Sequence, residues 1–271
     1  GVAPDAELVC YSIGEVLFTS AVVTAYDHLL DQPDMWGVDV INNSWGSGMP
    51  TNDPFMEDII EAWAAAGQFG VFANGNSGPG CNTSGSPGSR TIAYSVGNYT
   101  SSHVISSGSS RGAGQDGTIK PDISAPGSSV RSSVPGNGYA SYTGTSMASP
   151  HVAGAVALLW AGSPALAGDV QATRDLLDGT AIDTANAQCG GTPENNNVFG
   201  EGRLDALALV AATPRGDIGY LEGTVTDAAS GDPLPAVEVD RCDALAGLQV
   251  LQVVAGDRRR IADHRADHDG R

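Results

Sequence analysis

Short apolar runs alternate along most of the chain with longer segments in which apolar residues recur every three or four positions. Runs of the first kind predict buried strands, and segments of the second kind predict helices. The predicted strands cover residues 7–13, 38–45, 69–73, 92–96 and 128–133. The predicted helices cover residues 18–30, 56–68, 145–160, 169–177 and 203–211. Because strands and helices alternate, the pattern predicts an α/β fold with a parallel sheet.

The pattern changes after residue 212. Residues 213–218 begin with Thr-Pro-Arg-Gly and have the composition of a linker. Beyond it, residues 219–240 alternate like β-structure around a Ser-Gly-Asp-Pro turn, which predicts the start of a small β-sandwich module. Residues 241–271 contain six of the 13 Lys and Arg residues, and we expect an irregular or frame-shifted tail there. Residues 1–212 are therefore predicted to form the main domain.

The chain is strongly acidic, with a formal net charge of -18 over 271 residues. Such a surface repels nucleic-acid phosphates and anionic lipid. No segment approaches the ~20 consecutive apolar residues that span a bilayer. We therefore expect neither nucleic acid nor a membrane as a partner, and we expect a monomer.

The four cysteines form no Cys-x-x-Cys pair, which argues against zinc or thioredoxin-type chemistry. Cys10 lies in an apolar run and is predicted to be a small buried residue. Cys81 and Cys189 lie in loops rich in Gly, Asn and Ser, and we predict a disulfide between them. The fourth cysteine is Cys242, in the tail. No metal ligands are assigned.

Candidate chemistry begins with Ser146, which follows Gly144 and Thr145 at the predicted start of an apolar helix. A serine placed there lies at the positive end of the helix dipole, where backbone N–H groups stabilise negative charge. On these residues alone an ordinary capped helix start explains the pattern better than a nucleophile does. A second candidate is Asn76, in a loop directly after the strand at residues 69–73, although Asn-Gly pairs are also common in turns.

The whole string at residues 144–154, Gly-Thr-Ser-Met-Ala-Ser-Pro-His-Val-Ala-Gly, resembles the nucleophile motif of the subtilisin family (subtilases, peptidase S8) nearly letter for letter. Residues 72–79 are similar to the family's oxyanion loop, and residues 40–46 resemble its substrate-pairing strand. Further similar segments occur in the expected order at residues 1–8, 109–112, 120–127 and 196–206, so that the resemblance covers residues 1–212. Residues 219–239 are similar to carboxypeptidase regulatory-like β modules.

The resemblance implies a three-layer subtilisin-like fold and a secreted serine endopeptidase that acts on polypeptides. Ser146 would be the nucleophile, and the Asn76 side chain would join its backbone N–H in an oxyanion hole. Ser44, Trp45 and Gly46 would form one wall of the primary substrate pocket. Ala73, Asn74 and Gly75 would form the other wall, with Thr145 also contacting substrate. Because Ser77 is uncharged, we expect apolar rather than basic residues before the scissile bond.

Subtilases use a catalytic triad of Asp, His and Ser, and no motif for the Asp or the His is found in this sequence. In subtilases the order is Asp, His, Ser, and the histidine precedes a segment similar to residues 1–8. The five histidines present are poor substitutes, and these are His28, His103, His151, His264 and His268. We therefore expect a chain that lacks the N-terminal Asp and His segments and is inactive alone. No cofactor is expected for catalysis, and structural calcium, common in subtilases, is not assigned to residues.

Three alternatives stay open on the sequence. A sedolisin-type peptidase has an aspartate in its oxyanion hole, which Asn76 does not match. An α/β-hydrolase needs Gly-x-Ser-x-Gly, and here Ala148 takes the last position. The third alternative is a non-catalytic subtilase homologue that acts as a scaffold.

Overall fold

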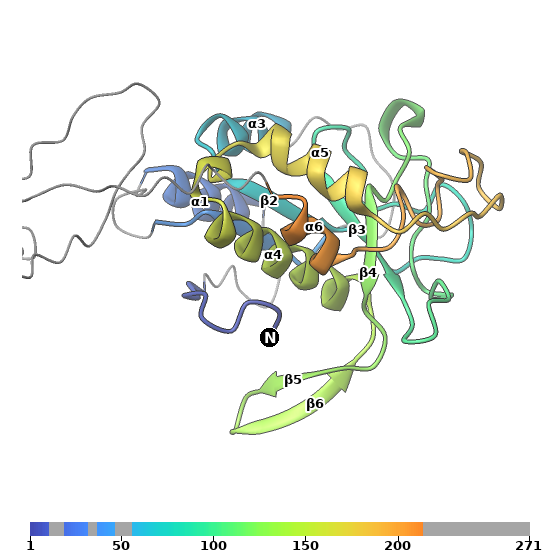
Figure 1. Cartoon of the computed structure of the whole chain (residues 1–271), viewed down its shortest axis with the longest axis horizontal. Helices are drawn as coiled ribbons and strands as arrows, with labels where there is room; N and C mark the ends of the chain where they lie inside the picture. Colours follow the sequence, from blue (N-terminus) through green and yellow to red (C-terminus); the bar gives the residue numbers. More distant parts are fainter. Residues whose placement is uncertain (11–18, 32–36, 47–55, 214–271) are drawn as a thin grey trace, which may run out of the picture. The chain divides into compact units, whose positions relative to one another are not determined.

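The computed structural model describes residues 1–10, 19–31, 37–46 and 56–213 (Figure 1). The chain divides into one unit of residues 1–216 and another of residues 217–271. The predicted module at 219–240, the tail at 241–271 and most of the linker at 213–218 lie outside the described residues. So do Cys242, His264 and His268.

Four parallel strands form the central sheet in the order β1-β2-β3-β4, and Figure 1 labels β2, β3 and β4 of this sheet. They are β1 (Val40–Asn43), β2 (Phe69–Ala73), β3 (Tyr94–Tyr99) and β4 (Ile123–Pro126). The first three confirm predicted strands, with β3 displaced by a few residues, whereas β4 was not predicted. Strand order follows chain order, so the carboxyl ends of β1 and β2 are neighbours at one edge of the sheet.

The predicted helices are all present. They are α1 (Thr19–Asp31), α3 (Glu57–Ala65), α4 (Thr145–Gly162), α5 (Val170–Thr180) and α6 (Ala206–Ala211). Single 3₁₀ turns occur at Gln115–Gly117 and Pro164–Leu166. Asp169 and Asp205 cap α5 and α6, because each side chain accepts a hydrogen bond from the backbone N–H three residues later. None of the described helices is long and apolar enough to cross a membrane.

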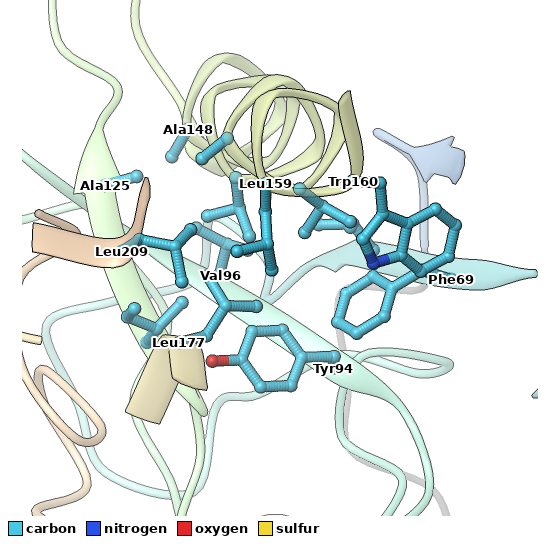
Figure 2. Close-up of a cluster of buried hydrophobic side chains, with 14 residues drawn as sticks. Phe69, Tyr94, Val96, Ala125, Ala148, Leu159, Trp160, Leu177 and Leu209 are labelled. Atoms are coloured by element: carbon cyan, nitrogen blue, oxygen red, sulfur yellow. The ribbon is translucent and has the colours of Figure 1, made fainter. Parts of the chain in front are cut away.

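Helices cover both faces of the sheet, which gives three layers. Alternate residues of β2 point to opposite faces. Phe69 and Val71 join the core cluster beneath α4, which Figure 2 shows together with Leu177 of α5 and Leu209 of α6. Phe72 joins a second cluster with residues of α1 and α3. Burying each such side chain contributes roughly 1.5–3 kcal/mol, so both faces of β2 stabilise the layers.

A two-stranded hairpin replaces the single strand predicted at residues 128–133. It consists of β5 (Val130–Val134) and β6 (Gly138–Tyr142), paired antiparallel. The turn between them places Gly136 and Asn137 at φ values of 82° and 59°. Glycine and asparagine tolerate this left-handed conformation better than other residues, and β6 was missed because its Gly-Tyr-Ala-Ser-Tyr sequence has no apolar run.

The predicted strand at residues 7–13 is wrong over its described part, because residues 7–10 form no strand. Leu8 and Val9 are 87% and 44% exposed. Cys10 is also exposed, so the prediction that it is buried is wrong. An apolar run is buried only when another element covers it, and among the described residues no strand pairs with this segment. Residues 11–13 lie outside the description.

Buried ionic groups connect β3 and β4 to α5. Lys120 is fully buried, and its Nζ lies 2.6 Å from both the Asp122 carboxylate and the Ala93 carbonyl oxygen. Burial lowers the pKa of Lys120, an effect that Asp122 opposes. The Tyr94 hydroxyl donates to Asp178 at 2.6 Å. Burial raises the pKa of Asp178 to about 6.

Candidate active site

The candidate nucleophile, Ser146, is the second residue of α4 and is half-buried. Its hydroxyl donates a hydrogen bond to the Ser44 carbonyl oxygen at 3.1 Å. The Ser146 N–H belongs to the first helical turn, where the helix itself supplies no acceptor. Both the hydroxyl and a backbone donor of this residue therefore lie at the positive end of the 18-residue helix α4.

The candidate oxyanion residue, Asn76, contacts the same end of α4. Its Oδ1 accepts hydrogen bonds from the Thr145 N–H at 2.9 Å and from the Thr145 hydroxyl at 3.1 Å. A backbone N–H only donates, so the carboxamide oxygen must be the atom that faces Thr145. This orientation leaves the two N–H bonds of Nδ2 as the donors of the exposed Asn76 side chain. The structure thus brings Asn76 and Ser146 to one helix end.

Gly144 makes this approach feasible. A Cβ atom at this position would lie 3.2 Å from Oδ1 and 3.5 Å from Nδ2 of Asn76. A Cβ at 144 would therefore require the carboxamide of Asn76 to shift by a few tenths of an ångström. The glycine of the Gly-Thr-Ser string therefore has a steric reason for its place.

Thr145 has a role that sequence reasoning missed. Its side chain is fully buried, and its Oγ1 accepts a hydrogen bond from the Gly75 N–H at 3.2 Å while donating to Asn76. The predicted substrate contact through this side chain has no support in that burial. Instead, the Thr145 hydroxyl holds the loop that contains Gly75 and Asn76 against α4. The only sign of this role in the sequence is that Thr145, which precedes the candidate nucleophile, carries a hydroxyl that can both donate and accept a hydrogen bond.

The two predicted pocket walls lie at adjacent strand ends. Asn43 of β1 is in register with Phe72 of β2, so residues 44–46 and 73–75 leave the sheet side by side. Ser44 is half-buried and Gly46 is exposed.

Some side chains within these walls point into the protein. Asn74 is fully buried, and its Nδ2 donates to the Ser110 carbonyl oxygen at 2.8 Å, so this side chain fixes the loop. Trp45 donates from its ring N–H to Asn43 Oδ1 at 3.3 Å and packs near Tyr26. Ala73 is buried at the end of β2. The side chains of Asn74 and Trp45 are therefore bonded within the protein.

Neither His103 nor His151 is hydrogen-bonded to Ser146, whose hydroxyl bonds the Ser44 carbonyl oxygen. The His151 ring nitrogen Nδ1 pairs instead with the Met147 carbonyl oxygen at 2.8 Å, one helical turn away. The His103 ring contacts Tyr99. Across the described ranges the structure also contains no group of three or more acidic, histidine or cysteine side chains able to hold a metal ion. Calcium therefore stays unassigned.

A disulfide closes the loop that follows Asn76. Cys81 and Cys189 are bonded, with their Cα atoms 5.4 Å apart, which confirms the predicted pair. The bridge joins the loop after β2 to the loop after α5. Backbone hydrogen bonds from Asn82 to Gly112 and from Thr83 to Arg111 hold the same segment.

The chain is similar in sequence to one family of known proteins. The Subtilase family (Peptidase S8) matches residues 1–202. Subtilisin Savinase from Lederbergia lenta is 37% identical over 210 residues, which cover 77% of this chain and 69% of that protein. Bacillopeptidase F from Bacillus subtilis (strain 168) is 36% identical over 195 residues, which cover 69% of this chain and 13% of that protein. Subtilisin E from the same strain is 33% identical over 193 residues, which cover 69% of this chain and 47% of that protein. The chain therefore spans less than half the length of the last two relatives.

Solved structures share the fold. The S41 psychrophilic protease is 29% identical, with a TM-score of 0.59 over 70% of this chain and 65% of that chain. The prenylagaramide maturation protease PagA has a TM-score of 0.61 at 22% identity, over 76% of this chain and 71% of that chain. The predicted α/β fold, a parallel sheet packed against helices, is confirmed.

Proposed function

This chain belongs to the subtilase family, and on that premise we propose that it forms part of a serine endopeptidase, with Ser146 as nucleophile and polypeptides as substrates. The observation that supports the proposal best is the orientation of Asn76. Its oxygen is held by two donors of Thr145, so its N–H donors remain for a ligand beside Ser146. A donor fixed in advance at the place where charge develops is what acyl transfer requires.

In the proposed reaction, the Ser146 hydroxyl oxygen attacks the carbonyl carbon of a peptide bond while a base removes its proton. The carbonyl oxygen becomes an oxyanion, which accepts hydrogen bonds from the Ser146 N–H and from Asn76 Nδ2. The tetrahedral intermediate then collapses, the peptide C–N bond breaks, and the leaving amine takes the proton from the base. Water hydrolyses the resulting acyl-enzyme by the same steps and restores the serine.

The base and the carboxylate that orients it come, in this proposal, from outside the described residues. The hydroxyl of Ser146 donates to the Ser44 carbonyl oxygen, which accepts a hydrogen bond but is too weak a base to take the proton. A histidine oriented by an aspartate is the arrangement that activates such a serine. The 271-residue chain alone is accordingly proposed to be inactive.

The proposed substrate is an extended polypeptide with an apolar residue before the scissile bond. Its backbone would lie along residues 44–46 and 73–75, the segments that leave β1 and β2 together. The proposed location is extracellular, supported by the Cys81–Cys189 disulfide, since such bonds persist in oxidising compartments.

An organophosphonate probe tests the proposal directly, because it phosphonylates only an activated serine. We expect the product of the complete gene to be labelled at Ser146 and to cleave a fluorogenic peptide with an apolar residue before the bond. Ser146→Ala should lose both labelling and cleavage, whereas Ser102→Ala, at an exposed position, should retain both.

The isolated 271-residue chain should show neither labelling nor cleavage. A folded product of the complete gene that is not labelled would favour a non-catalytic homologue. Labelling at a different residue would overturn the assignment of Ser146.

A further inference from the structure

Helix α4 contains a proline at a position that affects the candidate nucleophile. In an α-helix the carbonyl oxygen of each residue accepts from the N–H four residues later. The residue four positions after Ser146 is Pro150, which lies inside the helix and has no N–H. The carbonyl oxygen of Ser146 therefore loses the donor that the helix would normally give it.

Ser44 supplies the missing donor from a different element. Its hydroxyl donates to the Ser146 carbonyl oxygen at 2.9 Å, although the two residues are 102 positions apart in sequence. A carbonyl oxygen only accepts, so the single proton of the Ser44 hydroxyl is committed to this bond. Ser149 Oγ, which is fully buried and 3.0 Å away, must then donate to Ser44 Oγ. Asn42 Nδ2 also donates to Ser44 Oγ at 2.9 Å. The Ser44 hydroxyl thus donates one hydrogen bond, to residue 146, and accepts two, from Ser149 and Asn42.

The contact between the two residues is reciprocal. While the Ser44 hydroxyl donates to the Ser146 carbonyl oxygen, the Ser146 hydroxyl donates to the Ser44 carbonyl oxygen at 3.1 Å. On the other side, Thr145 is bonded to Asn76 in the loop after β2. The first turn of α4 is therefore tied to the end of β1 through residue 146 and to the end of β2 through residue 145.

We propose that Ser44 is a positioning residue for the nucleophile, whose hydroxyl replaces the N–H that Pro150 removes. The Ser146 carbonyl oxygen is therefore hydrogen-bonded to the residue that follows β1 and not to a residue of its own helix. This role is separate from the substrate contact expected of the Ser44 backbone. A displacement of about 1 Å at a nucleophile costs up to about a hundredfold in rate, so a fixed backbone here matters for catalysis. The kinetic part of the proposal rests on the proposed peptidase function.

A double-mutant cycle tests it, with Ser44→Ala, Pro150→Ala and the double variant in the product of the complete gene. Alanine in place of Pro150 restores the N–H four residues after Ser146. We expect Ser44→Ala to lower kcat about tenfold with little change in KM. In the Pro150→Ala background the same change should lower kcat less than about threefold, because the restored N–H then bonds the Ser146 carbonyl oxygen. Ser44→Thr, which retains a hydroxyl, should restore most of kcat.

The cycle is measured a second time by urea unfolding, which needs no activity. Ser44→Ala should destabilise the parent more than it destabilises Pro150→Ala. An equal loss of kcat and of stability in both backgrounds would overturn the proposal, because Ser44 would then not act through the carbonyl of residue 146. A change in KM alone would limit Ser44 to substrate contact. A parent without activity but with coupled unfolding energies would refute the peptidase function and leave the hydrogen-bond replacement intact.

Discussion

The Cys81–Cys189 disulfide closes a long loop, and its removal should be costly to stability. The two cysteines are separated by 108 positions in sequence. Cross-linking a loop of that length removes chain entropy from the unfolded state worth about 4.8 kcal/mol at 25 °C, and measured values are typically about 2–4 kcal/mol. We therefore expect the double variant Cys81→Ser, Cys189→Ser to lose about 3–5 kcal/mol of unfolding free energy.

Native activity should change little in that variant, because the segment has other anchors. Backbone hydrogen bonds join Asn82 to Gly112, Thr83 to Arg111 and Gly85 to Asn74 without help from the bridge. The loop that holds Asn76 is thus fixed in the folded state, and the disulfide acts mainly on the unfolded chain. A large loss of stability with a small loss of kcat/KM is the expected combination.

Urea unfolding measures the stability change, in a Cys10→Ser, Cys242→Ser background. That background is needed because neither cysteine belongs to the Cys81–Cys189 bridge, and a thiolate exchanges with disulfides in unfolded chains. The oxidised parent, the reduced parent and the double serine variant are compared. If the variant and the oxidised parent unfold within about 0.5 kcal/mol of each other, the chain-entropy reasoning is refuted. A collapse of activity at unchanged stability would instead show that the bridge shapes the oxyanion loop.

Three other predictions follow from buried charges and from the loop after Asn76. Because the pKa of Asp178 is raised from 3.8 to about 6, the folded state binds its proton more tightly, so stability should fall by up to about 3 kcal/mol as the pH rises from about 4 to above 6. Asp178→Asn should flatten that slope in pH-dependent melts, and an unchanged slope would assign it to other groups. Lys120→Met should cost about 3 kcal/mol, because it removes the nearer of the two cations that pair with the Asp122 carboxylate and leaves only Arg174, at 3.9 Å. Adding Asp122→Asn should recover part of the loss, and equal stability of Lys120→Met and parent in thermal melts would contradict this reasoning. If the proposed peptidase function holds, cleavage should follow apolar residues in preference to Arg or Lys, and Ser77→Asp should shift the ratio of kcat/KM about tenfold towards basic residues. A parent that already prefers basic residues would show this reasoning to be wrong.

Local patterns account for what could be predicted from sequence. The amphipathic helices, the buried strand β2 and the cysteine pair were all recognisable from neighbouring residues. Burial at residues 7–10 was not, because it depends on whether another element covers the segment, and Leu8 and Cys10 are exposed among the described residues. Strand β4 was missed because Ile-Ser-Ala-Pro has only one large apolar residue.

In the candidate site, too, some residues could be predicted from the sequence and others could not. Ser146 and Asn76 belong to strings whose resemblance to a family is visible in the sequence alone. The roles of Thr145 and Ser44 are not visible there, because each depends on a partner about 70 or more positions away. The sequence shows that Pro150 lies within a predicted helix and leaves the Ser146 carbonyl oxygen without its helical donor. It does not show that the Ser44 hydroxyl, at the end of β1, donates to this oxygen.

Lys120 is the only lysine of the chain, and it is fully buried between β3, β4 and α5. Acylating dyes, aldehyde supports and lysine-directed crosslinkers should therefore find no reactive lysine side chain among these 271 residues while the fold around β3 and β4 is intact. Labelling of Lys120 under native conditions would in turn report that the interior around it had opened.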